Sequence, residues 1–372
     1  MITLDSLSRP QRALFILLKA SIRNKAPEGS FFSFFSESEW KEVYRLAIEH
    51  GVMALAFDSV MRLPDEQKPP RSLKMSWAVS VDAVENRYAK QVSAVHDLAA
   101  FFKGNNISML LFKGLSLAQY YSIPSHREFG DLDIYLYGKY KEGSKLLVHQ
   151  GSKINHKDDK HTALTYKGVP VENHTNFLTL HRYSHLGSLE NRLQELCKES
   201  LNEYLSDSII FPVPDFSALY MMCHTIIHFP SSIVIRSLCD WVVFLEINKG
   251  RIDFINYKKA LADAGLTKIS DAITALAVRF LDLNPDSAPD FISNTVLEDK
   301  IFLDMVSPLV LRKSNPSVLE ILKFKYKLLN TRRWKYELVN PKGYNRFILN
   351  SFFFYLFHPR LILQLRKVKN EL

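Results

Sequence analysis

The first hundred residues place apolar side chains at the three- and four-residue spacing of amphipathic helices. Pro10 is typical of the first turn of a helix. Ser36 and Glu39 have the spacing of a capping box ahead of another apolar stripe. The stretch 72–103 has helical spacing and contains neither glycine nor proline, which predicts one long helix. We therefore expect a helical N-terminal region over residues 1–104.

The pattern changes at Asn105, where strand-like segments begin. The first is a continuous apolar run of strand length, and a tight turn and a short helical stripe follow it. The next alternates polar and apolar positions with a period of two, and a helix is expected over 139–149. The predicted strands are 107–112, 131–137, 162–166 and 169–175. Together they predict an α+β module over 105–185.

Helical spacing returns beyond residue 185. We find no internal repeat and no glycine-rich phosphate loop in the sequence. We predict an α+β fold in which a small mixed β-sheet core is embedded in mostly helical N- and C-terminal regions. The four predicted regions are 1–104, 105–185, 186–310 and a basic, aromatic C-terminal helical tail over 311–372.

The composition is that of a folded globular protein. The 372 residues are 47% hydrophobic and 23% charged, which excludes disordered, collagen-like and low-complexity chains. Three widely spaced cysteines argue against a disulfide scaffold and favour a reducing cytoplasm. We expect no export signal and no transmembrane segment, because 216–235 is interrupted by histidines and a proline and 347–357 is too short to span a bilayer.

Positive charge is concentrated towards the C-terminal end. The chain has a formal net charge of +9, and the tail 311–372 carries 14 lysines and arginines against three glutamates. Aromatic residues such as Trp334 and Tyr336 interleave with these cations. Such a face suits an anionic partner, either nucleic acid or a membrane surface. The alternative is an amphipathic helical cap whose aromatic residues are core and whose cations are solvated.

Two aspartates, Asp131 and Asp133, begin one of the predicted strands. Side chains at this spacing point to the same face, while Leu132 and Ile134 enter the core. Carboxylates held this close repel each other unless water or a cation neutralises them, and hard oxygen ligands suit Mg²⁺ or Mn²⁺. Taken alone, this spacing is more often that of solvated acids in a turn.

A third acid lies on a later predicted strand. Strand alternation puts Glu172 and His174 on one face and Val171 and Asn173 on the other. If the two acidic strands are neighbours, Glu172 joins the two aspartates in an arrangement suited to two-metal phosphoryl transfer. His174 then either orients Glu172, contacts the substrate, or is simply hydrogen-bonded at the strand end.

Other polar pairs have plainer interpretations. His224 and His228 share a helical face at a spacing that metal sites use, but no third ligand is evident, so we expect a buried pair. Arg236 and Asp240 have the spacing of a helical ion pair. The acids at 158–159 are typical of a solvated hairpin turn.

The chain resembles the uncharacterised nucleotidyltransferase family of the DNA polymerase beta superfamily in several motifs. These are LFKGLSLAQYY over 111–121, Pro124 with Arg127, GDLDI over 130–134 and VENH over 171–174. A looser match extends through 224–241, so about 130 residues are covered. The resemblance implies that the α+β module is a nucleotidyltransferase core.

The resemblance also implies roles for the three acids. Asp131 and Asp133 correspond to the metal-binding pair, and Glu172 to the third acid. The implied reaction transfers a nucleoside monophosphate from a nucleoside triphosphate such as ATP to a hydroxyl, with Mg²⁺ or Mn²⁺ as cofactor. The acceptor is not readable from the sequence, since small molecules, proteins and RNA all serve across the superfamily.

The turn before the short helix departs from the superfamily pattern. Lys113 and Gly114 occupy the place of a Gly-Ser pair that holds nucleotide phosphates in relatives. Either Lys113 supplies charge there or Ser116 supplies a hydroxyl. Arg127 is either a phosphate clamp, through its planar guanidinium, or part of a structural salt bridge. The departure leaves two other functions open, a catalytically inactive binding or scaffold protein and the toxin component of a toxin–antitoxin pair.

Overall fold

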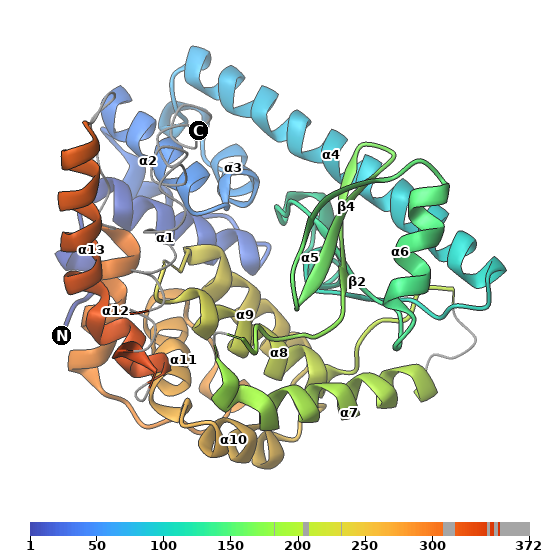
Figure 1. The fold of residues 1–372 in the computed structure, drawn as a ribbon. Helices are drawn as coiled ribbons and strands as arrows, with labels where there is room; N and C mark the ends of the chain where they lie inside the picture. Colours follow the sequence, from blue (N-terminus) through green and yellow to red (C-terminus); the bar gives the residue numbers. More distant parts are fainter. Residues whose placement is uncertain are drawn as a thin grey trace.

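The described residues form one mixed sheet embedded among helices (Figure 1). A computed structural model describes residues 1–181, 183–203, 208–231, 233–307, 317–340, 343–345 and 349. The predicted α+β class, with a small mixed sheet as its core, is confirmed. Within the described ranges, no helix is both long enough and apolar enough to span a bilayer.

The N-terminal region is helical, as predicted. Its helices are α1 (Arg9–Ile22), α2 (Glu37–Glu49), α3 (Met53–Met61) and α4 (Arg71–Gly104). The side chain of Ser36 accepts a hydrogen bond from the backbone of Glu39 and Glu39 reaches back, so the predicted capping box begins α2. The predicted long helix is α4, which in Figure 1 runs past the sheet.

The sheet has the strand order β1-β2-β5-β4-β3. Its strands are β1 (Leu110–Phe112), β2 (Leu132–Tyr135), β3 (Lys153–Lys157), β4 (His161–Tyr166) and β5 (Val169–His174). The central pair, β2 and β5, is parallel, and the other pairs are antiparallel. Strand β3 was not predicted, because all five of its side chains are exposed and show no apolar alternation. β1 is also shorter than the predicted 107–112.

The two faces of the sheet differ, and this difference positions the polar residues. Leu132 and Ile134 of β2 pack with Val171 of β5 on one face, against the C-terminal half of α4. Asp133 and Glu172 therefore belong to the opposite face, since successive side chains alternate. That second face is turned towards α8, where Tyr220 packs edge-on against Phe112 of β1.

Nine further helices lie between or after the strands in the described part of the chain. They are α5 (Gly114–Ala118), α6 (Tyr140–His149), α7 (Gly187–Glu203), α8 (Pro214–His228), α9 (Ile235–Ile247), α10 (Phe254–Asp263), α11 (Thr267–Leu281), α12 (Thr295–Val306) and α13 (Val318–Val339). The stretch 216–235 is divided between α8 and the start of α9, as its polar residues predicted. One hydrophobic cluster joins α1–α3 to α8–α12, so the N-terminal helices share their core with helices from the predicted region 186–310.

Only part of the basic tail is described. Its helix α13 lies against the helical core, where Trp334 packs edge-on against Phe229 and Lys335 contacts Asp304. Lys300 lies over the ring of Trp334, with 4.2 Å between the amine and the ring centroid. These contacts are those of a packed helical cap. Residues 350–372, including most of the stretch 347–357, lie outside the described residues, so an anionic partner for the tail stays a prediction.

Candidate active site

Asp133 and Glu172 face each other across the central parallel pair of strands. They are register partners on β2 and β5, and both belong to the face turned towards α8. His174, two residues after Glu172, brings its Nε2 to 3.0 Å from Asp133 Oδ1 and 3.3 Å from Glu172 Oε2. One ligand atom from each of these three residues lies within 4.8 Å of the other two. The structure thus brings together acidic groups from two separate strands.

Asp131 precedes β2 and lies beside this cluster without being one of its three members. It lines the cavity next to the cluster. Burial and the charge of Asp133 raise the pKa of Asp131 above its ordinary value. The two aspartates therefore interact as their spacing predicted, with Asp133 deeper in the protein and Asp131 nearer the cavity.

Lys113 forms an ion pair with the buried aspartate. Its Nζ lies 3.1 Å from Asp133 Oδ1. Burial raises the pKa of Asp133, but the Lys113 charge and the hydrogen bond from His174 outweigh burial and hold that pKa well below its usual range. In turn, the nearby carboxylates outweigh burial and raise the pKa of Lys113. Asp133 is therefore a carboxylate, and Lys113 an ammonium, at neutral pH.

The turn that carries Lys113 is strained and tight. Lys113 has φ +63° and ψ −138°, a backbone conformation that side chains other than glycine rarely adopt. At Gly114, an added Cβ would lie 3.0 Å from the Phe129 ring and 3.2 Å from the carbonyl oxygen of Asp131. The glycine thus lets the turn approach the loop that carries Asp131. This local packing fixes Lys113 over the acids.

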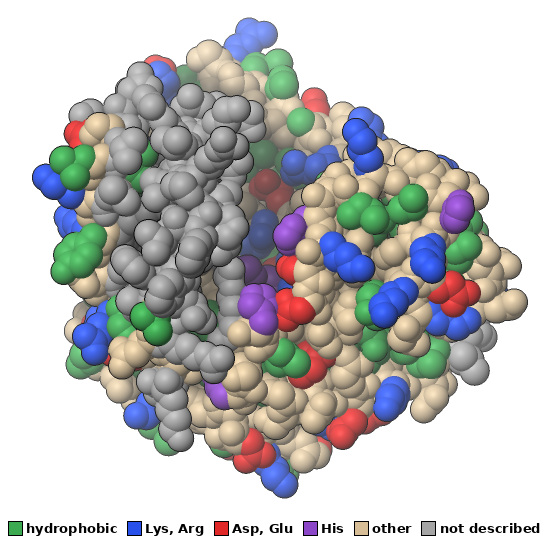
Figure 2. All heavy atoms as spheres, in the orientation of Figure 1, with side chains coloured by type: hydrophobic (Ala, Val, Ile, Leu, Met, Phe, Trp, Pro, Cys, Tyr) green, Lys and Arg blue, Asp and Glu red, His purple; other side chains and the backbone are tan. Residues whose placement is uncertain are grey.

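A cavity of about 600 Å³ opens beside the acids. The segment before β2 contributes Asp131 to its wall, β5 contributes Glu172, and α8 contributes His224 and His228. Figure 2 shows acidic, basic and histidine side chains gathered in a hollow next to the sheet-bearing part of the molecule. The hollow has a size typical of small-molecule sites and a mixed charge.

Two predicted nucleotide contacts, Ser116 and Arg127, are occupied or buried in the structure. Ser116 is 2% exposed and does not line the cavity. Arg127 lines the cavity, but its guanidinium is engaged: Nε and Nη2 donate to the carboxylate of Asp240 at 3.0 and 2.6 Å, and Nη1 donates to the carbonyl oxygen of Gly114 at 3.2 Å. Of the two alternatives for Arg127, the structure contains the salt bridge. Asp240 is thus partnered by Arg127 on another element, in place of Arg236 on its own helix.

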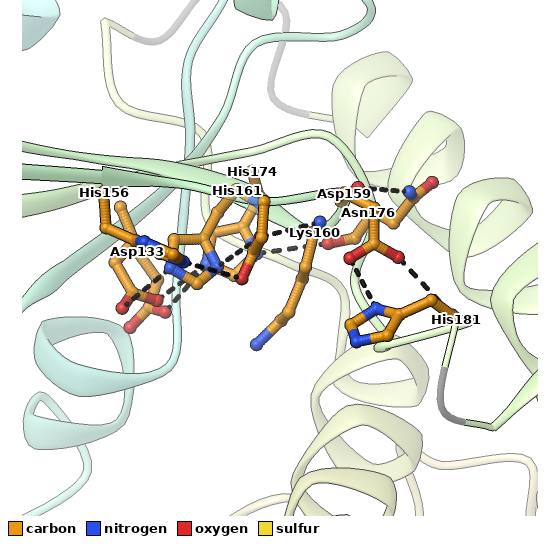
Figure 3. Close-up of polar contacts among 10 residues, drawn as sticks. Asp133, His156, Asp159, Lys160, His161, His174, Asn176 and His181 are labelled. Carbon is orange, nitrogen blue, oxygen red and sulfur yellow. Dashed lines mark hydrogen bonds and ion pairs between the residues drawn. The ribbon is translucent and has the colours of Figure 1, made fainter. Parts of the chain in front are cut away.

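Two other cations line the cavity and were missed as site residues. Within the described residues, neither the Lys160 amine nor the Arg236 guanidinium has a hydrogen bond or ion pair. Figure 3 shows the Lys160 side chain extending away from the contacts of its neighbours, with no dashed line at its amine. Burial and the charge of Lys113 lower the pKa of Lys160, while burial and the charge of Arg127 lower the pKa of Arg236. Each cation therefore lies near another cation.

Two histidines of α8, His224 and His228, lie close enough to Lys113 and Lys160 for these charges to add to desolvation in lowering their pKa values. The expected buried pair is wrong, because His224 is half-buried and His228 is exposed. Desolvation of the ring, followed by the charges of Lys160 and Lys113, nevertheless lowers the pKa of His228 to about 4. Burial and the charge of Lys113 also hold the pKa of His224 well below its ordinary value. Their rings are 4.4 Å apart between centroids. Both are neutral at pH 7, so this wall of the cavity offers uncharged donors and acceptors.

Comparison with known proteins places these residues in a family context. A model of an uncharacterised nucleotidyltransferase family matches residues 36–282. The matched range runs from α2 to α11 and contains every candidate residue described above. No curated protein and no solved structure matches the chain.

Proposed function

The chain belongs to the uncharacterised nucleotidyltransferase family, and on that premise we propose that it transfers a nucleoside monophosphate from a nucleoside triphosphate to a hydroxyl acceptor. The observation that carries this proposal is the convergence of Asp133 and Glu172 on adjacent parallel strands, with Asp131 beside them at the cavity wall. Phosphoryl transfer relies mainly on positioning and charge neutralisation, and this constellation suits both.

The acids fit a divalent cation, for which we propose Mg²⁺ or Mn²⁺. Asp133 Oδ2 is a buried carboxylate oxygen with no hydrogen-bond partner among the described residues, which is costly unless something binds it. Asp131, Asp133 and Glu172 are the residues that would hold the cation. When bound, it supplies charge neutralisation at the transferred phosphoryl group and lowers the pKa of an oxygen nucleophile.

We propose that cations of the cavity wall bind the triphosphate. Lys113 and the backbone at Gly114 occupy the turn beside the acids, and the Lys160 amine and the Arg236 guanidinium line the same cavity without a hydrogen-bond or ion-pair partner in the described part of the chain. Half-buried cations without partners are partly desolvated in the protein alone, so an anionic ligand would be bound with a gain in free energy. In this proposal the Lys113 ammonium contacts both Asp133 and the phosphates. Ser116 is omitted from this set because it is buried.

Glu172 is proposed as the residue that faces the acceptor. Its side chain is 22% exposed, whereas that of Asp133 is fully buried, so Glu172 is the acid of this pair that a hydroxyl from solvent reaches. Burial raises the pKa of Glu172, but its interactions with His174 and His161 together outweigh burial, and the pKa lies below its ordinary value. Glu172 is therefore an ionised acceptor of hydrogen bonds at neutral pH.

One observation favours a second function, that of a catalytically inactive binding protein. Lys113 already neutralises Asp133, so part of the acidic site is satisfied within the chain itself. An inactive protein of this kind would bind nucleotide through the cavity cations without turnover. A cytoplasmic location is proposed for either function, since Cys197, Cys223 and Cys239 are all free, buried thiols.

The experiment that tests the proposed function measures binding and turnover together. ATP with Mg²⁺ or Mn²⁺ is titrated into the wild type and Asp133→Asn by calorimetry, and pyrophosphate release is followed with pooled small-molecule, protein and RNA acceptors. We expect metal-dependent nucleotide binding and release in the wild type and loss of release in Asp133→Asn. The matched control is Asp159→Asn, which changes an exposed acid on the neighbouring hairpin. This variant should keep both nucleotide binding and pyrophosphate release. Nucleotide binding without release in the wild type would favour the inactive protein.

A further inference from the structure

His174 lies between the two acids of the cluster. Its side chain and that of Asp133 are fully buried, and Nε2 lies within 3.3 Å of carboxylate oxygens from both Asp133 and Glu172. β5 directs His174 and Glu172 to the same face because they are two residues apart. The imidazole thus lies at the centre of the cluster.

The other ring nitrogen shows which atom carries the proton. His174 Nδ1 lies 3.2 Å from the carbonyl oxygen of Asn176, and a carbonyl oxygen only accepts hydrogen bonds. Nδ1 therefore carries a hydrogen. Nε2 either carries a second hydrogen and donates it to Asp133, as in the hydrogen bond described above, or presents a lone pair to the carboxylates of Asp133 and Glu172. That contact repels unless a proton or a cation lies between them.

This arrangement is the one that metal-binding histidines adopt. A ligating imidazole donates its second N–H to a carbonyl or carboxylate, which fixes the ring and leaves the other nitrogen for the metal. The backbone carbonyl of Asn176 plays this part for His174. Independently, Asp133 Oδ2 is buried without a hydrogen-bond partner among the described residues. One buried oxygen of the cluster thus lacks a partner among the described residues, and a cation would supply that partner and take the place of the proton at Nε2.

We propose that His174 Nε2, Asp133 and Glu172 together bind one divalent transition-metal ion, and that this site selects Mn²⁺ over Mg²⁺. The inference rests on the proposed function for the presence of a metal, and it differs from that function in that His174 replaces Asp131 among the ligands of this ion and in the choice of the ion. Imidazole nitrogen is a ligand for transition metals, whereas Mg²⁺ binds oxygen and keeps several waters. Asp131 does not belong to this ligand set, and it stays available to a second ion or the substrate at the cavity.

The test is spectroscopic and does not depend on turnover. Mn²⁺ is added to the metal-free full-length protein, and pulsed electron paramagnetic resonance detects modulation by a coordinated nitrogen. We expect imidazole ¹⁴N modulation in the wild type, and its replacement by the ¹⁵N pattern when the protein is grown with ¹⁵N-labelled histidine. His174→Gln is expected to lose the modulation and to bind Mn²⁺ ~10-fold or more weakly. His181→Gln, which lines the same cavity, is the matched control and retains both.

Competition separates the ions. We expect Mg²⁺ to displace Mn²⁺ from the wild type only in at least ~10-fold excess, and this preference to disappear in His174→Gln. Bound Mn²⁺ without nitrogen modulation would overturn the inference and leave the proposed function in place, since a carboxylate-only site still serves phosphoryl transfer. Absence of any bound Mn²⁺ or Mg²⁺, with or without ATP, would overturn both. The isotope measurement keeps the test decisive even if His174→Gln fails to fold.

Discussion

Arg127 and Asp240 form a two-point ion pair that ties the loop before β2 to helix α9. Both side chains are buried, and Tyr121 donates a further hydrogen bond to Asp240. Through its third contact, with the carbonyl oxygen of Gly114, Arg127 also holds the turn that carries Lys113. The pair therefore holds in place the turn that lies beside the acids of the cavity.

Removal of one partner from this pair is expected to destabilise the fold. Arg127→Met should lower the free energy of unfolding by about 3 to 5 kcal/mol, because it leaves the Asp240 carboxylate buried and unpaired. Arg127→Lys should recover only part of the loss, since an ammonium cannot make the two-point contact. Urea unfolding of the two variants and of Arg127→Met/Asp240→Leu measures this, and the double variant should be less damaged than Arg127→Met. A nearly unchanged free energy combined with weakened ATP binding would instead assign Arg127 to the substrate.

The free cations of the cavity give a prediction on affinity. Lys160→Met and Arg236→Met should each weaken ATP binding ~10- to 100-fold, because each removes a charge-assisted hydrogen bond worth roughly 1.5 to 3 kcal/mol. Neither variant should be destabilised, since each removes a half-buried cation that has no partner in the described structure. Isothermal calorimetry measures the affinity, and Lys157→Met on the exposed strand β3 is the control. Unchanged affinity in both variants would remove these residues from the proposed phosphate site.

The sequence predicts those features of the fold and the site that depend on patterns between residues near one another in the chain. The strand alternation around Asp133 and Glu172 is a local signal, and it predicted correctly which side chains share a face. It could not establish that β2 and β5 are neighbours, because pairing between strands so far apart in the sequence depends on the whole fold. The parallel register is therefore a result of the structure.

The residues that sequence reasoning missed lack such a signal. Lys160 lies among other charged residues at a hairpin, a pattern that equally fits a solvated turn. Asp240 lies four residues after Arg236 on the same helix, and this spacing suggested that the two form an ion pair. In the structure Asp240 instead pairs with Arg127. Only the three-dimensional contacts reveal which cations are paired and which remain free. The positive φ of Lys113 is likewise invisible in its sequence neighbourhood.

A buried histidine predicts how stability depends on pH. His50 is 4% exposed, and burial followed by the charge of Arg45 lowers its pKa to about 4. In the unfolded chain the pKa is about 6.5, so the unfolded state binds the proton more readily. The contribution of the neutral ring is therefore complete above pH 6.5 and is lost as the pH falls from 6.5 to 4.

The expected size of this effect is about 3 kcal/mol between pH 6.5 and 4. His50→Gln should show a correspondingly smaller fall in the free energy of unfolding over this range, whatever its stability at pH 7. Urea unfolding at several pH values measures the two slopes. His149→Gln, at an exposed position, is the control and should keep the wild-type slope. Equal slopes for the wild type and His50→Gln would show that this ring does not titrate as its burial requires.

Gly51, between helices α2 and α3, lies against the side chain of Arg236, which lines the cavity. Its φ is +64°, and an added Cβ would lie 2.7 Å from Nη1 of Arg236. Gly51→Ala should therefore have two separate effects. The left-handed backbone conformation costs roughly 1 to 2 kcal/mol of stability, and the displaced guanidinium should weaken ATP binding in the same direction as Arg236→Met.

A matched glycine separates the two effects. Gly250 has φ +75°, and an added Cβ there meets nothing within 4 Å. Gly250→Ala should lose a similar free energy of unfolding and keep the wild-type affinity for ATP, whereas Gly51→Ala loses both. In the double variant Gly51→Ala/Arg236→Met, the affinity should be no lower than in Arg236→Met alone, because the two substitutions act on the same guanidinium. Additive losses of affinity would mean that Gly51 acts on the site by another route and that Arg236 is not the group it positions.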